Sequence, residues 1–287
     1  MRLATLRVAG RTRAARVESD GGAILLDAPD VGTLLQHPNW EDLARADGPR
    51  ADFAPEDLAP PITLRSAKVF LVGFNFGSHA TELGREQPAY PSIFAKYPES
   101  LVGAHDPIAL PHHSLSVQND WEVELVTVIG TAGRHIPIAD APRHIAGYCV
   151  GNDTGVRDWQ FRNRPPLMGK AWEAMTPIGP WLTTDSGPVD AMRLTTDVDG
   201  ERVQDGLGAD MIFDPATVIS YLSTVITLQP GDMIFLGTPP GIALGQEPAP
   251  WLHPGQTLTT AISGLGELRN LCVESPAPAT SDWTIHG

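Results

Sequence analysis

Residues 121–129 read WEVELVTVI, the stretch of this chain that most clearly predicts a buried β-strand. The run is rich in β-branched and apolar residues, which favour strands. Side chains two positions apart in a strand share a face, so Glu122 and Glu124 are expected side by side, on a face that Val126 and Val128 continue. Two neighbouring carboxylates on a largely apolar face repel each other and are costly to desolvate, and a bound divalent cation would relieve both problems.

The periodicity leaves a second interpretation of this strand open. At the edge of a sheet, both glutamates would point into water, and the alternate side chains of residues 121–129 would form the only buried face.

Asp153 follows a second apolar run, residues 144–150, and precedes residues 155–162, which are expected to be helical. Binding sites tend to form where strands end, so Asp153 could supply a third oxygen ligand. A few carboxylates with open positions for water or substrate are typical of a Mg²⁺ site. Alternatively, Asp153 caps the helix or stabilises a turn.

His79 and Glu82 lie in a short helix expected over residues 78–84, after a buried strand at residues 68–73. Positions i and i+3 of a helix share a face. A histidine oriented by a carboxylate is a common general base, because its pKa lies near neutrality. The alternative is a surface pair that stabilises the helix by a few tenths of a kcal/mol.

Three further side chains have an anion-binding or a structural interpretation. Lys170 lies between small residues and could approach a substrate carboxylate or enolate, or it could be solvated. Arg157 and Gln160 follow Asp153 and could bind a carboxylate, although Arg157 could equally form a structural ion pair.

Two adjacent histidines, His112 and His113, are a further possible pair of metal ligands. The sequence supplies no third ligand at zinc spacing for them, so this pair is expected at the surface.

Composition excludes several classes of protein. The formal net charge of −14 and the absence of a Lys/Arg run argue against nucleic-acid binding. Cys149 and Cys272 are the only cysteines and form no CxxC pair, so neither a disulfide framework nor a zinc site is expected. No apolar run has signal-peptide or membrane-spanning length, which predicts a soluble, cytoplasmic protein without a membrane partner.

Pro60 and Pro61 favour an extended connection, which suggests a small β-rich N-terminal domain at residues 1–62 and a main domain at residues 63–287.

Several sequence motifs, in their residues and in their order, resemble those of the fumarylacetoacetate hydrolase family over about residues 66–272. The blocks that carry the resemblance are VGFNFGSHATE (72–82), FAKYPESLVG (94–103), WEVEL (121–125), GNDTGVRDWQ (151–160), GKAW (169–172), TPIGPW (176–181), ADMIF (209–213) and LQPGDMIFLGTPPG (228–241). The resemblance implies an α+β, mostly β fold, a mixed β-sandwich roll with few helices that usually forms homodimers.

The resemblance also assigns site residues. The Mg²⁺ or Mn²⁺ ligands of the family fall on Glu122, Glu124 and Asp153. The remaining family positions are a His-x-x-Glu dyad on a mobile lid, an active-site lysine, the threonine of a Gly-Thr-Pro loop near the substrate carboxylate, and two positions of less defined role. They fall on His79, Glu82, Lys170, Thr238, Arg157 and Gln160.

The expected activity is metal-dependent hydrolysis of a carbon–carbon bond in an acylpyruvate-type 1,3-diketo acid, releasing a 2-oxo acid such as pyruvate. The same site in the family also suits a decarboxylase, an isomerase or a dehydratase, and a non-catalytic binding protein is a further alternative. Three residues depart from the common pattern and make the pocket more apolar: Phe76 and Trp121 stand where tyrosine is frequent, and Leu236 replaces a frequent threonine.

Overall fold

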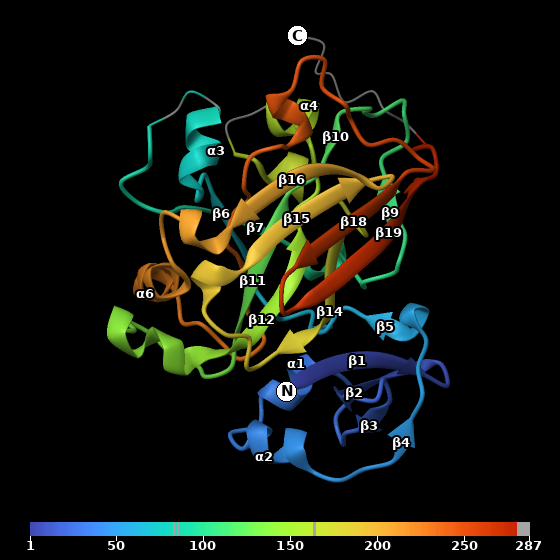
Figure 1. The fold of residues 1–287 in the computed structure, drawn as a ribbon, viewed down its shortest axis with the longest axis vertical. Coiled ribbons are helices and arrows are strands. Elements are labelled where there is room, and N and C mark those ends of the chain that lie inside the picture. Colours follow the sequence, from blue (N-terminus) through green and yellow to red (C-terminus); the bar gives the residue numbers. More distant parts are fainter. Residues whose placement is uncertain (83, 85, 163–164, 280–287) are drawn as a thin grey trace.

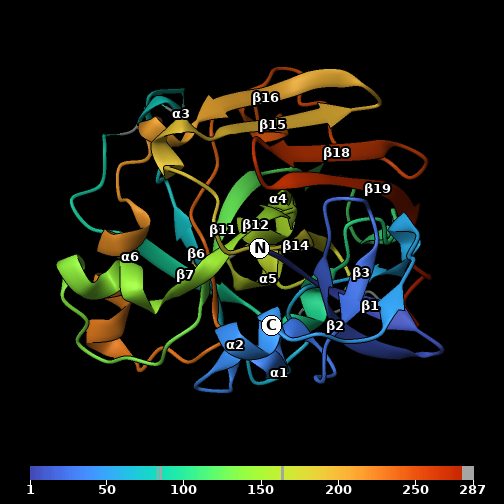
Figure 2. The same ribbon diagram turned by 60° about the horizontal axis from the view of Figure 1, so that its bottom comes forward.

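Two β-sheets packed face to face form the body of the molecule in this computed structural model, which describes residues 1–82, 84, 86–162 and 165–279 (Figures 1 and 2). The larger, twelve-stranded sheet is mixed. Its strands are, in spatial order, β4 (Arg50–Ala51), β3 (Ala23–Leu25), β2 (Arg11–Val17), β1 (Arg2–Val8), β14 (Thr176–Thr183), β12 (Ile145–Asn152), β11 (Val123–Ile129), β17 (Met233–Phe235), β6 (Val69–Gly73) and β7 (Ser92–Lys96), with β5 (Leu58–Ala59) beside β1 and β8 (Leu101–Val102) beside β14.

The second sheet covers one face of the first (Figure 2). Its five strands are β16 (Glu201–Leu207), β15 (Arg193–Val198), β18 (Thr257–Ile262), β19 (Gly266–Glu274) and β9 (Ile108–Leu110). A separate pair consists of β10 (Asn119–Asp120) and β13 (Gly155–Val156). The α-helices are short: α1 (Val31–Leu35), α2 (Trp40–Arg45), α3 (Gly77–Glu82), α4 (Arg157–Gln160), α5 (Leu167–Lys170) and α6 (Pro215–Val225). The predicted α+β, mostly β class is confirmed.

Strand β11 runs through the middle of the large sheet, between β12 and β17. Val123 and Leu125 pack in the core between the two sheets. Val126 and Val128 belong to a second core on the opposite face, which α1 also covers. Because every residue of β11 is buried, the edge-strand interpretation is wrong.

The strand predicted over residues 121–129 begins two residues later, at Val123. The cause is that side chains, rather than a neighbouring strand, accept the backbone N–H groups here. The backbone N–H of Trp121 donates to the carboxylate of Asp120 at 2.8 Å, and that of Glu122 donates to Oδ1 of Asn152 at 2.9 Å. Side chains therefore take the donors that a strand ladder would use, and Glu122 lies just outside the strand while Glu124 lies within it.

The helix predicted over residues 155–162 is shorter than expected. Gly155 pairs with Asp120 in the β10–β13 ladder, and the N–H of Arg157 donates to the carbonyl of Gln118. These backbone bonds hold the first two residues extended, so α4 begins only at Arg157.

The first 62 residues contribute strands β1–β5 and helices α1 and α2. Strand β1 pairs antiparallel with β14, matching Arg2 with Thr183 and Leu3 with Leu182. The N-terminal strands thus extend the large sheet, and the predicted domain boundary at residue 62 stays a prediction. Within the described residues, no helix is long and apolar enough to cross a membrane.

Candidate metal centre and active-site cavity

A cavity of about 700 Å³ opens where several strands of the large sheet end. Strands β6 and β7 contribute Val72 and Phe94, the start of β11 contributes Glu124, and the loop after β17 contributes Thr238. Helices α3, α4 and α5 close the remaining sides. The predicted site residues that line the cavity are His79, Glu122, Glu124, Arg157, Gln160, Lys170 and Thr238.

The three carboxylates predicted to bind metal converge at this cavity. Glu122, Glu124 and Asp153 each offer an oxygen, and these oxygens lie within 4.8 Å of one another. Their exposed fractions are 8%, 2% and 0%. Asp153 does not cap a helix, since β13 follows it and its side chain faces basic residues, so the capping interpretation is wrong.

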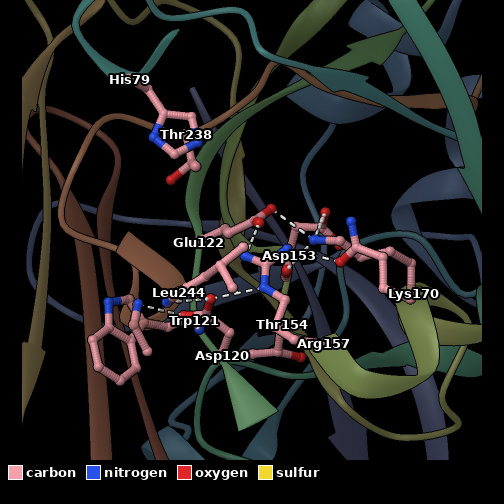
Figure 3. A network of polar contacts seen from close by, with 12 residues as sticks. His79, Asp120, Trp121, Glu122, Asp153, Thr154, Arg157, Lys170, Thr238 and Leu244 are labelled. Atoms are coloured by element: carbon pink, nitrogen blue, oxygen red, sulfur yellow. Dashed lines mark hydrogen bonds and ion pairs between the residues drawn. The ribbon is translucent and has the colours of Figure 1, made fainter. Parts of the chain in front are cut away.

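Three buried basic side chains lie beside the carboxylates, and Figure 3 shows two of them, Arg157 and Lys170. Nζ of Lys170 lies 2.7 Å from Glu122 Oε2 and 2.6 Å from Asp153 Oδ2. Lys170 is 2% exposed, so the solvated interpretation is wrong. Nζ of Lys96 lies 2.7 Å from Asp153 Oδ1. Arg157 forms an ion pair with Glu122 and donates from Nε to Asp120 at 2.8 Å.

These pairings shift the pKa values of the site in opposite directions. Burial opposes ionisation of Glu122, but the adjacent Lys170 and Arg157 outweigh it and lower the pKa of that carboxyl. Glu124 differs: burial, followed by repulsion from Asp153 and Glu122, raises the pKa of its carboxyl well above the usual value. Burial also lowers the pKa of Lys96, although Asp153 partly offsets it. Burial also raises the pKa of Asp153, although two lysines pair with it, whereas Glu124 has no such partner among the described residues.

Glu124 is the residue that makes a divalent cation fit here. Within the described residues it forms no ion pair, and its carboxylate accepts a single hydrogen bond, from the N–H of Gly237 at 2.6 Å. Hard cations such as Mg²⁺ and Mn²⁺ prefer oxygen ligands. A cation held by Glu122, Glu124 and Asp153 would relieve the repulsion that Glu124 experiences.

His79 and Glu82 form a hydrogen-bonded pair on α3. Nδ1 of His79 lies 2.9 Å from Glu82 Oε2, and the other oxygen of Glu82 accepts the N–H of Gly241 at 3.1 Å. His79 is 6% exposed and lines the cavity, which does not fit the surface-pair interpretation. With Nδ1 engaged by the carboxylate, Nε2 is the ring atom left for proton transfer. Figure 3 shows His79 and Thr238 to one side of Glu122, with Lys170 and Arg157 to the other.

The three predicted substrate-binding residues are already hydrogen bonded. Oγ1 of Thr238 accepts from Gln204 Nε2 at 2.9 Å, which leaves its hydroxyl hydrogen for a ligand. Gln160 accepts from Arg157 at 2.8 Å, which leaves its amide hydrogens for a ligand. The substrate-binding role of Arg157 stays a prediction. Because its guanidinium is bonded to Asp120, Glu122 and Gln160, we propose that it positions Glu122 instead.

Sequence reasoning missed three residues that support the site. Asp120 holds Arg157 and accepts the N–H of Ala243 at 2.7 Å. Lys96 compensates Asp153, and its presence in the FAKYPESLVG block was the only signal. Gln204 fixes Thr238 from the second sheet and accepts the N–H of Val123 at 3.0 Å, a contact that no sequence pattern predicts.

Comparison with known proteins gives consistent matches. The family model described as "Fumarylacetoacetate (FAA) hydrolase C-terminal" matches residues 68–273. A protein from Burkholderia ambifaria, provisionally named a hydrolase, is 44% identical over 207 residues, covering 71% of this chain and 73% of the relative. The solved structure of 5-carboxymethyl-2-hydroxymuconate delta-isomerase from Mycobacterium smegmatis is 30% identical, with a TM-score of 0.78 over 96% of this chain and 100% of that one. Fumarylpyruvate hydrolase from Pseudomonas aeruginosa, solved in complex with Mn²⁺ and pyruvate, is 33% identical, with a TM-score of 0.66 over 75% of this chain and 91% of that one.

Proposed function

This chain belongs to the fumarylacetoacetate hydrolase family, and we propose that it is a divalent-metal-dependent hydrolase of an acylpyruvate-type 1,3-diketo acid. The products would be a carboxylic acid and a 2-oxo acid such as pyruvate. The observation that carries the proposal is that oxygens of Glu122, Glu124 and Asp153 lie within 4.8 Å of one another, beside a cavity that His79 also lines. The similarity to fumarylpyruvate hydrolase, solved with Mn²⁺ and pyruvate, and the sequence identity to a relative named a hydrolase support this choice.

A bound Mg²⁺ or Mn²⁺ would polarise the carboxylate and keto oxygens of the 2-oxo acid. His79 would take a proton from water at Nε2, while Glu82 keeps Nδ1–H oriented. The hydroxide attacks the distal carbonyl, the carbon–carbon bond breaks, and the electron pair leaves as the enolate of the 2-oxo acid, which takes the proton back from Nε2 of His79. Lys170, whose ammonium lines the cavity, would stabilise the developing negative charge, and Thr238 would donate to the substrate carboxylate.

The apolar cavity wall has a role in this scheme. Val72, Phe94 and Leu244 line the cavity together with the polar groups. Such a wall would hold the acyl group and limit water to the molecule activated by His79, which strengthens the electrostatic interactions in the site. We further propose that the protein is a cytoplasmic homodimer, as members of the family that it resembles usually are dimers.

An isomerase is the second candidate, because the chain is also similar to the solved 5-carboxymethyl-2-hydroxymuconate delta-isomerase. Moving a double bond requires proton transfers and no water nucleophile, and the His79–Glu82 pair could perform them. Decarboxylation of a 3-carboxy-2-oxo acid would use the same enolate stabilisation.

A metal-dependent product assay would separate these reactions. Chelator-stripped protein is resupplied with Mg²⁺ or Mn²⁺ and given acetylpyruvate and oxaloacetate in parallel, with pyruvate, acetate and CO₂ quantified. Equal amounts of pyruvate and acetate, formed only with metal, would support the hydrolase. CO₂ from oxaloacetate alone would favour a decarboxylase, and no turnover of either by metal-loaded protein would refute the acylpyruvase activity.

A further inference from the structure

A second cluster of metal-ligating side chains lies outside the active-site cavity, on the surface. His112, His113 and Glu274 each offer one ligand atom, and these atoms lie within 4.8 Å of one another. None of the three lines the cavity described above. Glu274 and His113 are separated by 161 positions in the sequence. For this reason the sequence indicates only a histidine pair and no third ligand.

The fold brings the third ligand to the pair through strand pairing. Strands β9 and β19 run parallel, and Glu274 at the end of β19 pairs with Leu110 at the end of β9. His112 follows Leu110 by two residues. The backbone N–H of His113 then donates to Glu274 Oε1 at 3.0 Å, which fixes the loop after β9 against the last strand.

The two imidazole rings are held side by side. Their centroids are 4.1 Å apart, with 36° between the ring planes. Nδ1 of His113 lies 2.7 Å from Glu274 Oε1, and Nδ1 of His112 lies 2.9 Å from the Ser114 hydroxyl. The backbone N–H of Ser114 also donates to Nδ1 of His112, at 3.2 Å, so polar neighbours hold both rings in place.

Glu274 is suited to complete the set. Within the described part of the chain, its second oxygen, Oε2, takes part in no hydrogen bond or ion pair. That oxygen can turn toward a cation, which would replace the hydrogen that Glu274 shares with Nδ1 of His113.

We propose that His112, His113 and Glu274 form a second divalent-cation site, selective for a zinc-like ion. Two imidazoles and a carboxylate are a common zinc ligand set, whereas the active-site triad supplies oxygen alone. Zinc bound here would tie the end of β19 to the loop after β9. The proposal does not depend on the activity of the enzyme.

Zinc titration of the metal-stripped full-length protein tests this site. We expect two zinc ions per wild-type chain, one at the triad and one at the surface cluster, because Zn²⁺ also binds carboxylates. The double substitution His112→Ala with His113→Ala should remove one ion, and Glu124→Gln should remove the other. Glu274→Gln should weaken zinc binding at the cluster about 10-fold or more. In the Glu124→Gln protein, X-ray absorption should show imidazole nitrogen bound to zinc.

The matched control is His37→Ala, which removes another exposed histidine from a different part of the fold and should leave two ions bound. All three cluster residues are at the surface or partly exposed, and Mn²⁺ affinity at the triad reports whether each variant of the cluster is folded. An unchanged zinc stoichiometry in the double variant would overturn the proposal, as would a single wild-type zinc ion that disappears in Glu124→Gln.

Discussion

Replacing Glu124 with glutamine should make the metal-free protein more stable at pH 8 while removing most of its affinity for Mn²⁺. Glu124 is 2% exposed, and its carboxylate lies beside those of Glu122 and Asp153. Glutamine has nearly the same shape, and its carbonyl oxygen can still accept the N–H of Gly237. The substitution therefore removes a charge and a metal ligand with little change in packing.

The size of the effect follows from the geometry. The triad oxygens lie within 4.8 Å of one another, so each pair of ionised carboxylates repels by roughly 3.5 kcal/mol at an effective dielectric constant of about 20. Attraction from Lys170 offsets part of this repulsion. We expect the free energy of unfolding to increase by about 1–3 kcal/mol, less than the full repulsion.

The raised pKa of Glu124 determines the direction in which the stability of the metal-free protein changes with pH. Burial, Asp153 and Glu122 raise the pKa of Glu124 in the folded state. Between the unfolded-state pKa, about 4.3, and the higher folded-state pKa, the folded protein binds more protons, so stability falls as pH rises through this window. Below it, Glu124 is protonated in both states and the advantage of glutamine disappears.

Denaturant unfolding of chelator-treated wild type and Glu124→Gln at pH 4 and pH 8 measures this difference, and Mn²⁺ titration calorimetry measures affinity, with an expected loss of about 100-fold or more. Glu201→Gln, at an exposed position, is the control and should change neither quantity. Lower stability of metal-free Glu124→Gln at pH 8, together with wild-type Mn²⁺ affinity, would refute the reasoning.

Three further outcomes are expected. His79→Gln should lower kcat on acetylpyruvate by about 10²–10⁴-fold and leave Mn²⁺ affinity unchanged, since it removes the proton acceptor and no metal ligand; equal loss of metal affinity in calorimetry would contradict this. Arg157→Gln should lower the free energy of unfolding by about 3–5 kcal/mol in urea, because Asp120 and Glu122 would lose a buried partner, and a change below 1 kcal/mol would contradict the ion-pair assignment. Leu125→Ala should cost about 2–5 kcal/mol in the same assay, because Leu125 is fully buried between the sheets, whereas a negligible loss would mean that this core is loosely packed.

The sequence predicts the fold class and the buried centre of the molecule because local patterns are strong there. The run of β-branched residues in 121–129 predicts β11, which lies at the centre of the large sheet. Its start was misplaced because Asn152, distant in sequence, takes the N–H of Glu122. The helix expected from residue 155 was misplaced for a similar reason, the pairing of Gly155 with Asp120. Local periodicity carries no information about such partners.

The same limit applies to the site. Spacing alone brings His79 and Glu82 together, because both lie on one short helix. Periodicity left the exposure of Glu124 and Lys170 undecided, since the burial of each depends on segments that fold around it. Gln204, from the second sheet, could not be found at all, because its contact with Thr238 joins residues 34 positions apart on different strands and loops.

The charge inventory of the site links metal binding to substrate binding. The buried charged groups of the site are four carboxylates and three basic side chains: Asp120, Glu122, Glu124 and Asp153, with Lys96, Arg157 and Lys170. With all of them ionised, these groups carry one net negative charge, which disfavours an anionic 2-oxo acid. A divalent cation would reverse the sign, and a substrate carboxylate would then neutralise it. We therefore expect pyruvate to bind measurably only after Mn²⁺, and calorimetry that showed equal pyruvate affinity without metal would contradict this order.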